Sequence, residues 1–368
     1  MRREQINDKE GICLITLFVT GSTLILGIGS EAKNDAWLAG IAGILMSLPM
    51  ILIYSRMLSL FQGSDLFDIL EITMGKVIGK IAAVLYIWYA FHIGTLVTRN
   101  FGEFLGTVAM PETPMMSPIL ILSLCCIINV RNGIEVMART AAYLLPIFIT
   151  IIVVVQFLAI PKLEPSNLQP ILGGGIVPIL KGGFFAFSFP FAETVLMTGT
   201  HYALKNKKSH YKVYLYGIFI AGATIILLTI RNIMILGLMR NRLYFSSHTA
   251  VAMISIGEFL QRIEVTVGFT FIVGVFIKTS VCLFVACKGI SKVIGLRDYR
   301  SIVIQTGLLM AFVAYVLFES IMEMFDFAMK VYPYYAFPFQ VIFPIIIWCL
   351  AEIKAKKLKH QKAFRTAK

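Results

Sequence analysis

Two stretches decide the fold, ITLFVTGSTLILGIG at residues 15–29 and GGFFAFSFPFAETVLMTG at residues 182–199. Both belong to long apolar runs, yet both carry residues that interrupt helices near the middle of the run. Gly21 is followed by two hydroxyl residues, and a glycine inside a helix costs about 1 kcal/mol relative to alanine. Pro190 lacks the backbone N–H and clashes with the preceding turn. We therefore predict two apolar helices that are broken near their centres.

The composition is that of a membrane-spanning protein. Of the 368 residues, 58% are hydrophobic and 14% are charged, and the mean hydropathy is +0.82. Soluble domains are about 45–50% apolar and about a quarter charged, and roughly 20 apolar residues span a bilayer core. The apolar runs predict an all-α polytopic membrane protein, one membrane domain over residues 1–368. Its expected transmembrane helices, about ten in number, are 11–30, 36–60, 78–105, 116–130, 139–160, 178–200, 212–238, 262–287, 301–322 and 336–352.

The basic residues predict how these helices are oriented. If the N-terminus is cytoplasmic, 23 of the 33 Lys and Arg residues fall in cytoplasmic segments and six fall on the opposite side. This split follows the positive-inside rule, so both termini are predicted to be cytoplasmic. Because the basic residues alternate with the spans, the net charge of +13 does not indicate nucleic acid as a partner. The basic tail at 353–368 is interpreted as a topology signal, with contact to anionic lipid headgroups of the bilayer as the alternative.

The sequence shows none of the usual patterns of enzymes or metalloproteins. Its six cysteines lie in apolar runs without the spacing of metal ligands or of a disulfide framework. No phosphate-binding loop, metal-ligand cluster or nucleophile elbow appears. We therefore expect no enzymatic activity, no cofactor and no metal site.

The two interrupted runs are the first and the sixth of the ten predicted spans. Because they are five spans apart, they enter the membrane in opposite directions, which is typical of a five-plus-five inverted repeat, here residues 11–160 and 178–352. Interrupted helices in matching positions indicate a substrate site near the membrane midplane. Exposed backbone groups and half-helix N-termini there can hold a carboxylate. The alternative is a glycine contact face in the first span and a simple proline kink in the sixth.

Short motifs along the chain resemble those of one known family. Gly21 matches a mid-span glycine, the loop NLQPILGGG at 167–175 is similar to the family's entry to span six, and Ser188-Phe189 with Glu193 is similar to a motif inside that span. Further similar positions are Tyr89, Thr98, Arg99, Glu103, Arg262, Ile263 and Glu264. In order and spacing these motifs resemble the spore germination permease family. Its members are B-subunits of endospore germinant receptors within the amino acid–polyamine–organocation superfamily.

This resemblance implies an amino-acid-transporter-like fold in the cell membrane, specifically the inner membrane of the dormant spore. It also implies an A-type membrane subunit and a C-type lipoprotein subunit as partners, and small germinants such as amino acids as ligands. The chain departs from many members at Thr23, where they have a second glycine, and at Pro190, where relatives can have another residue. Both positions belong to the predicted pocket, so the resemblance does not specify the germinant.

The predicted ligand site lies between the broken centres of spans one and six. Backbone groups of the first span are expected to hold a carboxylate, aromatic and hydroxyl residues of the sixth to close the other side, and a tyrosine of the third to cap the ligand. The residues in question are Gly21, Ser22, Thr23, Tyr89, Phe187, Ser188, Phe189 and Pro190.

Charged residues within the predicted spans are expected to have a structural or functional role, because each costs about 2.5–3.5 kcal/mol at the bilayer centre. Arg99 and Glu103 are four residues apart and can form a structural ion pair or a gate. Glu193 could be a proton site, a cap on the broken helix or an ion partner. Two interpretations fit the pair Lys278 and Thr279. Lys278 could pair with Glu193 or a backbone carbonyl, or it could supply a fixed positive charge where sodium-coupled proteins of this fold hold a cation between spans one and eight.

Three functions remain open from the sequence. The first is a germinant-sensing subunit in which ligand binding shifts an open–closed equilibrium. The second is a proton-coupled amino-acid transporter. The third is a scaffold, or an ion or water conduit, of the receptor complex.

Overall fold

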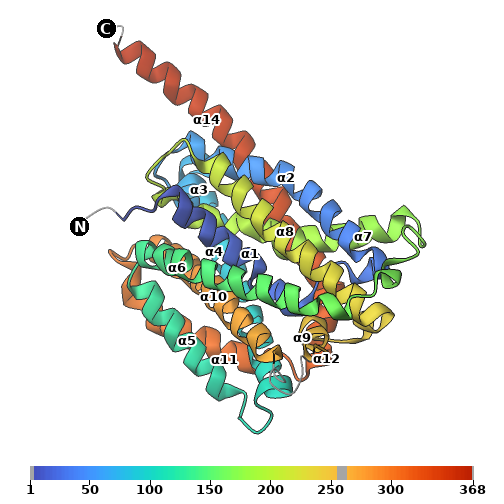
Figure 1. The fold of residues 1–368 in the computed structure, drawn as a ribbon. Helices are drawn as coiled ribbons and strands as arrows, with labels where there is room; N and C mark the ends of the chain where they lie inside the picture. Colours follow the sequence, from blue (N-terminus) through green and yellow to red (C-terminus); the bar gives the residue numbers. More distant parts are fainter. Residues whose placement is uncertain (1–3, 255–262, 367–368) are drawn as a thin grey trace.

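The computed structural model describes residues 4–254 and 263–366, and these form a bundle of long helices joined by short connections (Figure 1). In the first half of the chain the helices are α1 (Asp8–Leu26), α2 (Ala36–Leu60), α3 (Leu66–Met74), α4 (Lys76–Phe104), α5 (Met116–Arg131) and α6 (Ile134–Ala159). In the second half they are α7 (Ile176–Ala186), α8 (His210–Leu236), α9 (Ser246–Ala252), α10 (Glu264–Ile294), α11 (Val303–Val316), α12 (Ile321–Asp326), α13 (Tyr332–Phe337) and α14 (Phe343–Thr366).

The predicted all-α membrane fold is confirmed. Within the described residues, nine helical segments are long and apolar enough to cross a membrane. The fourth predicted span, 116–130, corresponds to α5, which has 16 residues and is too short to be counted among the nine. Two features were not predicted: α3 lies between the second and third spans, and the last segment is helical from Ile321 onward and continues through the basic tail to Thr366.

Both termini lie at the same end of the bundle, as an even number of spans requires (Figure 1). Near the N-terminus, Ile6 forms a backbone bridge with Leu204, and Glu4 Oε1 lies 2.5 Å from Arg300 Nη2. These contacts bring together three of the segments that the charge pattern places in the cytoplasm. That this end faces the cytoplasm stays a prediction.

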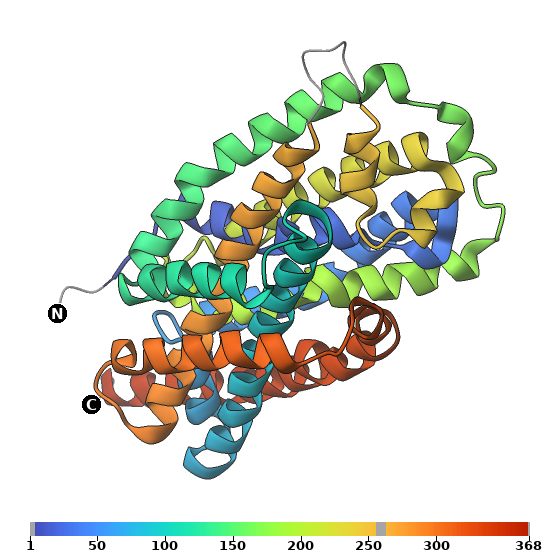
Figure 2. The same ribbon diagram turned by 90° about the horizontal axis from the view of Figure 1, so that it is seen from below.

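The centre of the bundle is built on α10, which packs along both α4 and α1. On the other side of α1 lies α8, while α5 and α11 run side by side farther out (Figures 1 and 2). The contact between α1 and α10 is unusually close. A Cβ added to Gly21 would lie 2.6 Å from the Gly274 carbonyl oxygen. Two glycines therefore let the two helix backbones touch.

The break in the first apolar run lies six residues later than predicted. The helix α1 continues through Gly21, and its Thr23 hydroxyl bonds back to the Val19 carbonyl at 3.0 Å. It ends at Leu26, where Gly27 and Gly29 adopt φ angles of +70° and +66° that favour glycine. The 3-10 helix η1 (Ser30–Asp35) follows. The expectation of open backbone at Gly21 was wrong because this glycine serves the contact with α10.

The break in the sixth apolar run lies where the sequence places it. The helix α7 ends at Ala186 and is followed by η5 (Phe187–Phe191), in which Phe189 has the extended angles φ −132° and ψ 111°. The chain then continues as the 3-10 helix η6 (Ala192–Gly199). Both segments are discontinuous, as the fold class requires, and η6 begins next to Glu193.

Candidate functional site

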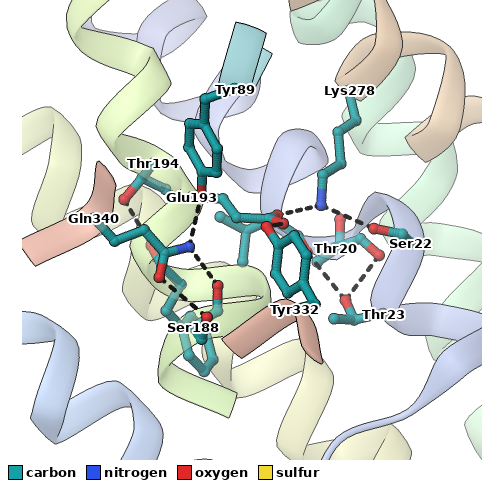
Figure 3. A network of polar contacts seen from close by, with 12 residues as sticks. Thr20, Ser22, Thr23, Tyr89, Ser188, Glu193, Thr194, Lys278, Tyr332 and Gln340 are labelled. Carbon is teal, nitrogen blue, oxygen red and sulfur yellow. Dashed lines mark hydrogen bonds and ion pairs between the residues drawn. The ribbon is translucent and has the colours of Figure 1, made fainter. Parts of the chain in front are cut away.

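A buried ion pair forms the centre of the candidate site (Figure 3). Lys278 Nζ lies 2.5 Å from Glu193 Oε2 and donates a hydrogen bond of 2.9 Å to Ser22 Oγ. The Tyr332 hydroxyl donates to the other carboxylate oxygen of Glu193. Lys278 is 0% exposed and Glu193 is 1% exposed. The pair joins α10, η6, α1 and α13, so it connects the first, sixth, eighth and last spans.

The local structure explains how these groups meet. Lys278 lies one helical turn after Gly274, where α10 touches α1, so its ammonium reaches Ser22 on α1. The ring centroid of Phe189 lies 4.8 Å from Lys278 Nζ, which adds a cation–π contact. Glu193 follows the break in the sixth span. A buried carboxylate needs an opposite charge and hydrogen bonds to offset its loss of hydration, and Lys278 and Tyr332 supply both.

A second buried cluster surrounds Gln340, in η11 (Pro338–Ile342) of the last span. Its amide nitrogen donates to the Tyr89 hydroxyl at 2.8 Å and to the Ser188 carbonyl at 2.7 Å. The Ser188 hydroxyl donates to the amide oxygen at 3.1 Å. Tyr54 donates to the backbone carbonyl of Gln340. This cluster holds the last span against the broken sixth segment (Figure 3).

A cavity of about 220 Å³ extends from the ion pair to the loops at the end of the bundle opposite the termini. Its inner end is formed by Ser22, Glu193 and Tyr332, and its outer part includes Arg240 from the 3-10 helix η8 (Gly237–Arg242). Most of the remaining wall is apolar. Other residues that line the cavity are Gly27, Phe189, Ser246, Ala328 and Asn100.

The predicted pocket residues divide into those that line this cavity and those that support it. Ser22 and Phe189 line it. Glu193, which was expected to be a proton site, a cap or an ion partner, lines it too. Gly21 contacts α10 instead, and Tyr89 stacks on Phe339 with ring centroids 4.6 Å apart. The remaining predicted residues are buried and are neighbours of the lining residues in the chain; they are Thr23, Phe187, Ser188 and Pro190.

The pair Arg99 and Glu103 has a structural setting. Arg99 Nη2 lies 2.7 Å from Glu103 Oε1, and Arg99 Nη1 donates to the Tyr315 carbonyl at 2.7 Å. Tyr315 is in the last turn of α11, where carbonyls lack helical partners and a positive charge is favourable. These contacts favour the structural ion pair over the gate.

Thr279 is buried beside Lys278, and its hydroxyl has no hydrogen-bond partner among the described residues. Arg262, from the family-like motif before span eight, lies outside the described residues. In the part of the chain that the structure covers, no three His, Cys, Asp or Glu side chains gather as a metal site would require.

Four residues of the site were missed by the sequence analysis, for understandable reasons. Tyr332 and Gln340 belong to the last span, and Gln340 is a single amide in an apolar stretch, a signal that could have been used. Asn100 follows Arg99 directly, and it was overlooked because the charged Arg99 was taken as the polar residue of that turn. Arg240 was counted only as a basic residue outside the membrane.

Together, the interrupted first and sixth helices and the cavity between them define a transporter-like membrane protein. The structure superimposes on Mhp1, a nucleobase-cation-symport-1 family transporter in a closed conformation with bromovinylhydantoin bound, with a TM-score of 0.66. That match covers 99% of this chain and 93% of Mhp1 at 11% identity. MhsT, in complex with L-phenylalanine, matches with a TM-score of 0.61 over 96% of this chain and 100% of that chain at 10% identity. These likenesses confirm the fold.

The sequence comparison then gives the family. A family model described as "Spore germination protein" matches residues 5–324, so the chain belongs to the spore germination permease family. Spore germination protein KB of Bacillus subtilis (strain 168) is 28% identical over 371 residues, covering 98% of each chain. The resemblance drawn from the motifs is thereby confirmed, and the chain is a multi-pass membrane protein of the germination system.

Proposed function

We propose that this chain is the ligand-sensing membrane subunit of a germinant receptor. The observation that carries the proposal is the cavity of about 220 Å³ that ends on Glu193, Ser22 and Tyr332. An engineered protein cavity of about 150 Å³ holds benzene, so this one has room for a molecule of amino-acid size. Family membership supports germination as the process that the ligand controls.

The proposed ligand lies against Ser22 and Phe189, the predicted pocket residues that line the cavity, and against Glu193. The other predicted residues hold the lining residues in place. They are Gly21, Thr23, Tyr89, Phe187, Ser188 and Pro190. This replaces the earlier expectation that backbone groups at Gly21 would hold the ligand.

Signalling requires that the ligand bind two conformations with unequal affinity. The cavity wall includes the ends of both interrupted helices and part of the last span, so a ligand contacts elements from both halves of the chain. A change in their spacing would alter the Glu193–Lys278–Tyr332 contacts at the inner end. We propose that this movement is transmitted to partner subunits.

The assembly that we propose is the one the family implies. The chain would lie in the inner membrane of the spore with both termini in the cytoplasm, next to an A-type membrane subunit and a C-type lipoprotein subunit. Support comes from the family match and from the basic segments gathered at the end of the bundle that holds both termini.

A specific observation also favours a second candidate, proton-coupled transport of an amino acid. The fold is shared with solved transporters, and a buried carboxylate, ammonium and phenol meet at the inner end of the cavity. Buried ionisable residues within a membrane often form proton relays. In this function Glu193 would be the coupling residue.

Binding and flux measured on the same preparation separate the two candidates. The purified chain is reconstituted into liposomes, and a panel of radiolabelled amino acids is tested for equilibrium binding and for accumulation under an imposed proton gradient. The sensor predicts saturable binding without accumulation above protein-free liposomes. Accumulation that collapses with a protonophore would instead establish the transporter, and absence of both binding and flux would contradict both functions.

A further inference from the structure

Arg240 is a buried cation, and most of its hydrogen-bonding groups have no partner among the residues that the structure describes. Only 6% of the surface of Arg240 is exposed. One nitrogen, Nη2, donates to the Ile28 carbonyl at 2.5 Å. The other two, Nε and Nη1, have no hydrogen-bond partner in the described part of the chain. A guanidinium that is buried without an opposite charge is costly, so native structures normally provide an anion for it.

The surroundings of Arg240 leave it facing the cavity. It lines the cavity together with Gly27 and Ser246. A Cβ added to Gly27 would lie 3.6 Å from Arg240 Nη2 and 3.7 Å from Ser246 Oγ. Residue 27 is a glycine with a φ of +70°, so it places no side chain of its own beside the guanidinium.

A second unpartnered group lines the same cavity from α4. Asn100 is 3% exposed, and neither its amide nitrogen nor its amide oxygen has a hydrogen-bond partner among the described residues. Leaving such a buried polar group unpaired costs about 1–3 kcal/mol. Two orphaned polar side chains, from helices far apart in sequence, therefore line one cavity.

The chain offers no acid to neutralise Arg240 within the described residues. Glu193 is the acidic residue that lines the cavity, and its two oxygens are bound by Lys278 and Tyr332. Among the described residues, the inner end of the cavity is thus electrically balanced, whereas the outer part carries a positive charge without an acidic partner.

We propose that Arg240 and Asn100 form a carboxylate-binding subsite, so that the ligand of this cavity is a small molecule that carries a carboxylate. The inference rests on the proposed function, because it names the chemical class of the ligand. Arg240 supplies charged N–H donors to the carboxylate, and Asn100 supplies a further donor and an acceptor for the ligand's other polar group. The body of the ligand lies against the apolar wall.

The test compares amino acids with their amides, which differ only in the charged carboxylate. Calorimetry measures binding of both panels to the purified full-length chain and to Arg240→Gln, Asn100→Leu and the exposed control Lys33→Gln. The same titrations with sodium chloride and with glucose supply an inorganic anion and a neutral polyol. We expect at least one amino acid to bind at least 30-fold more tightly than its amide. Arg240→Gln should weaken that amino acid about 10- to 100-fold without weakening the amide, and Asn100→Leu should weaken it several-fold.

Each contrary outcome has a distinct meaning. If wild-type protein binds amides or glucose as tightly as amino acids, or if Arg240→Gln retains full affinity for the amino acid, the inference is overturned and the proposed function stands. Chloride binding that depends on Arg240 and is not displaced by any carboxylate also overturns it. If the wild-type chain binds nothing in the panel, the proposed function fails and the inference falls with it.

Discussion

Lys278 Nζ lies 2.5 Å from Glu193 Oε2 in a place where neither side chain reaches solvent. Lys278 also donates to Ser22, so its charge sits between α1 and α10, the first and eighth spans. The sequence left open an ion pair with Glu193 and a fixed charge between these two spans. In the structure Lys278 does both: it pairs with Glu193, and its charge lies between the two spans.

Removing one member of this pair should destabilise the protein more than removing both. Lys278→Met leaves the Glu193 carboxylate buried without its cation, which costs about 3–5 kcal/mol. We expect a lower temperature of unfolding in detergent, or loss of the protein from the membrane. The double variant Glu193→Gln with Lys278→Met should recover at least half of the lost stability. A double variant as unstable as the sum of both singles would show that the two residues are energetically independent.

The contact between α1 and α10 predicts a sharp contrast among glycines. Gly21→Ala places a Cβ 2.6 Å from the Gly274 carbonyl oxygen and forces the helices apart, and overpacking of this kind costs about 1–3 kcal/mol. Gly268→Ala is the matched control, since its Cβ would meet Phe104 at an ordinary 3.7 Å. We expect the unfolding temperature in detergent to fall for Gly21→Ala, whereas Gly268→Ala, inside α10, should leave it unchanged or raise it. Equal shifts for both would mean that the close contact does not exist.

The cluster around Gln340 should stabilise the junction between the last span and the sixth segment. Gln340→Leu removes the donor to the Ser188 carbonyl and to the Tyr89 hydroxyl, leaving buried groups unpaired at a cost of about 1–3 kcal/mol. Tyr89→Phe removes one hydrogen bond from the same cluster and should cost less. The unfolding temperatures of the two variants test this order, which would be refuted by a Gln340→Leu protein as stable as wild type.

His201, in the short helix η7 (His201–Ala203), should make stability depend on pH. Burial lowers the pKa of His201 to about 3, from an ordinary 6.5. Its Nε2 lies 3.3 Å from the Gly11 carbonyl oxygen, and the Tyr214 ring packs against it. The neighbouring His210, another buried imidazole, lowers the pKa of His201 further.

Because the folded-state pKa is depressed, the unfolded chain takes up the proton more readily than the folded chain below pH 6.5. Stability is therefore fully present above pH 6.5 and is lost as the pH falls towards 3, by about 2 kcal/mol at pH 5. His201→Gln should remove this part of the pH dependence, as measured by unfolding at pH 7 and pH 5. A variant with the same loss between these pH values as wild type would exclude His201 as its source.

The features of the fold that depend on the length of apolar runs and on helix-breaking residues could be predicted from the sequence. The all-helical membrane fold, the shared end of the termini and the break at Pro190 follow from composition, charge and proline geometry, and the structure agrees. Of the ten predicted spans, nine correspond to described helical segments long enough to cross a membrane, and the fourth corresponds to the shorter α5. The break in the first span was misplaced because glycine has two uses. Gly21 permits close packing against α10, whereas Gly27 adopts a left-handed φ that ends the helix.

The contacts of Tyr332 and Arg240 could not be predicted, because they depend on which helices meet. Tyr332 could have been an ordinary packing residue until the structure placed its hydroxyl on Glu193. The role of Arg240 depends on the Ile28 carbonyl, more than 200 residues away in sequence. The spacing of residues along the sequence does not show which distant side chains come into contact.

The central claim is that a small germinant binds in the cavity and thereby controls germination. Ala328 lines the cavity, so Ala328→Trp should fill much of its volume. Met322, in α12 of the same segment, is 64% exposed and does not line the cavity, so Met322→Trp is the matched control. Both variants are placed in spores that lack other receptors of this class, and membrane content is checked by immunoblot.

The decisive measurement is equilibrium binding of the germinant to the purified variants, alongside the germination response of those spores. We predict that Ala328→Trp accumulates normally, binds the germinant at least 30-fold more weakly and no longer responds, while Met322→Trp behaves as wild type. An Ala328→Trp protein that accumulates, binds and responds like wild type would contradict the account.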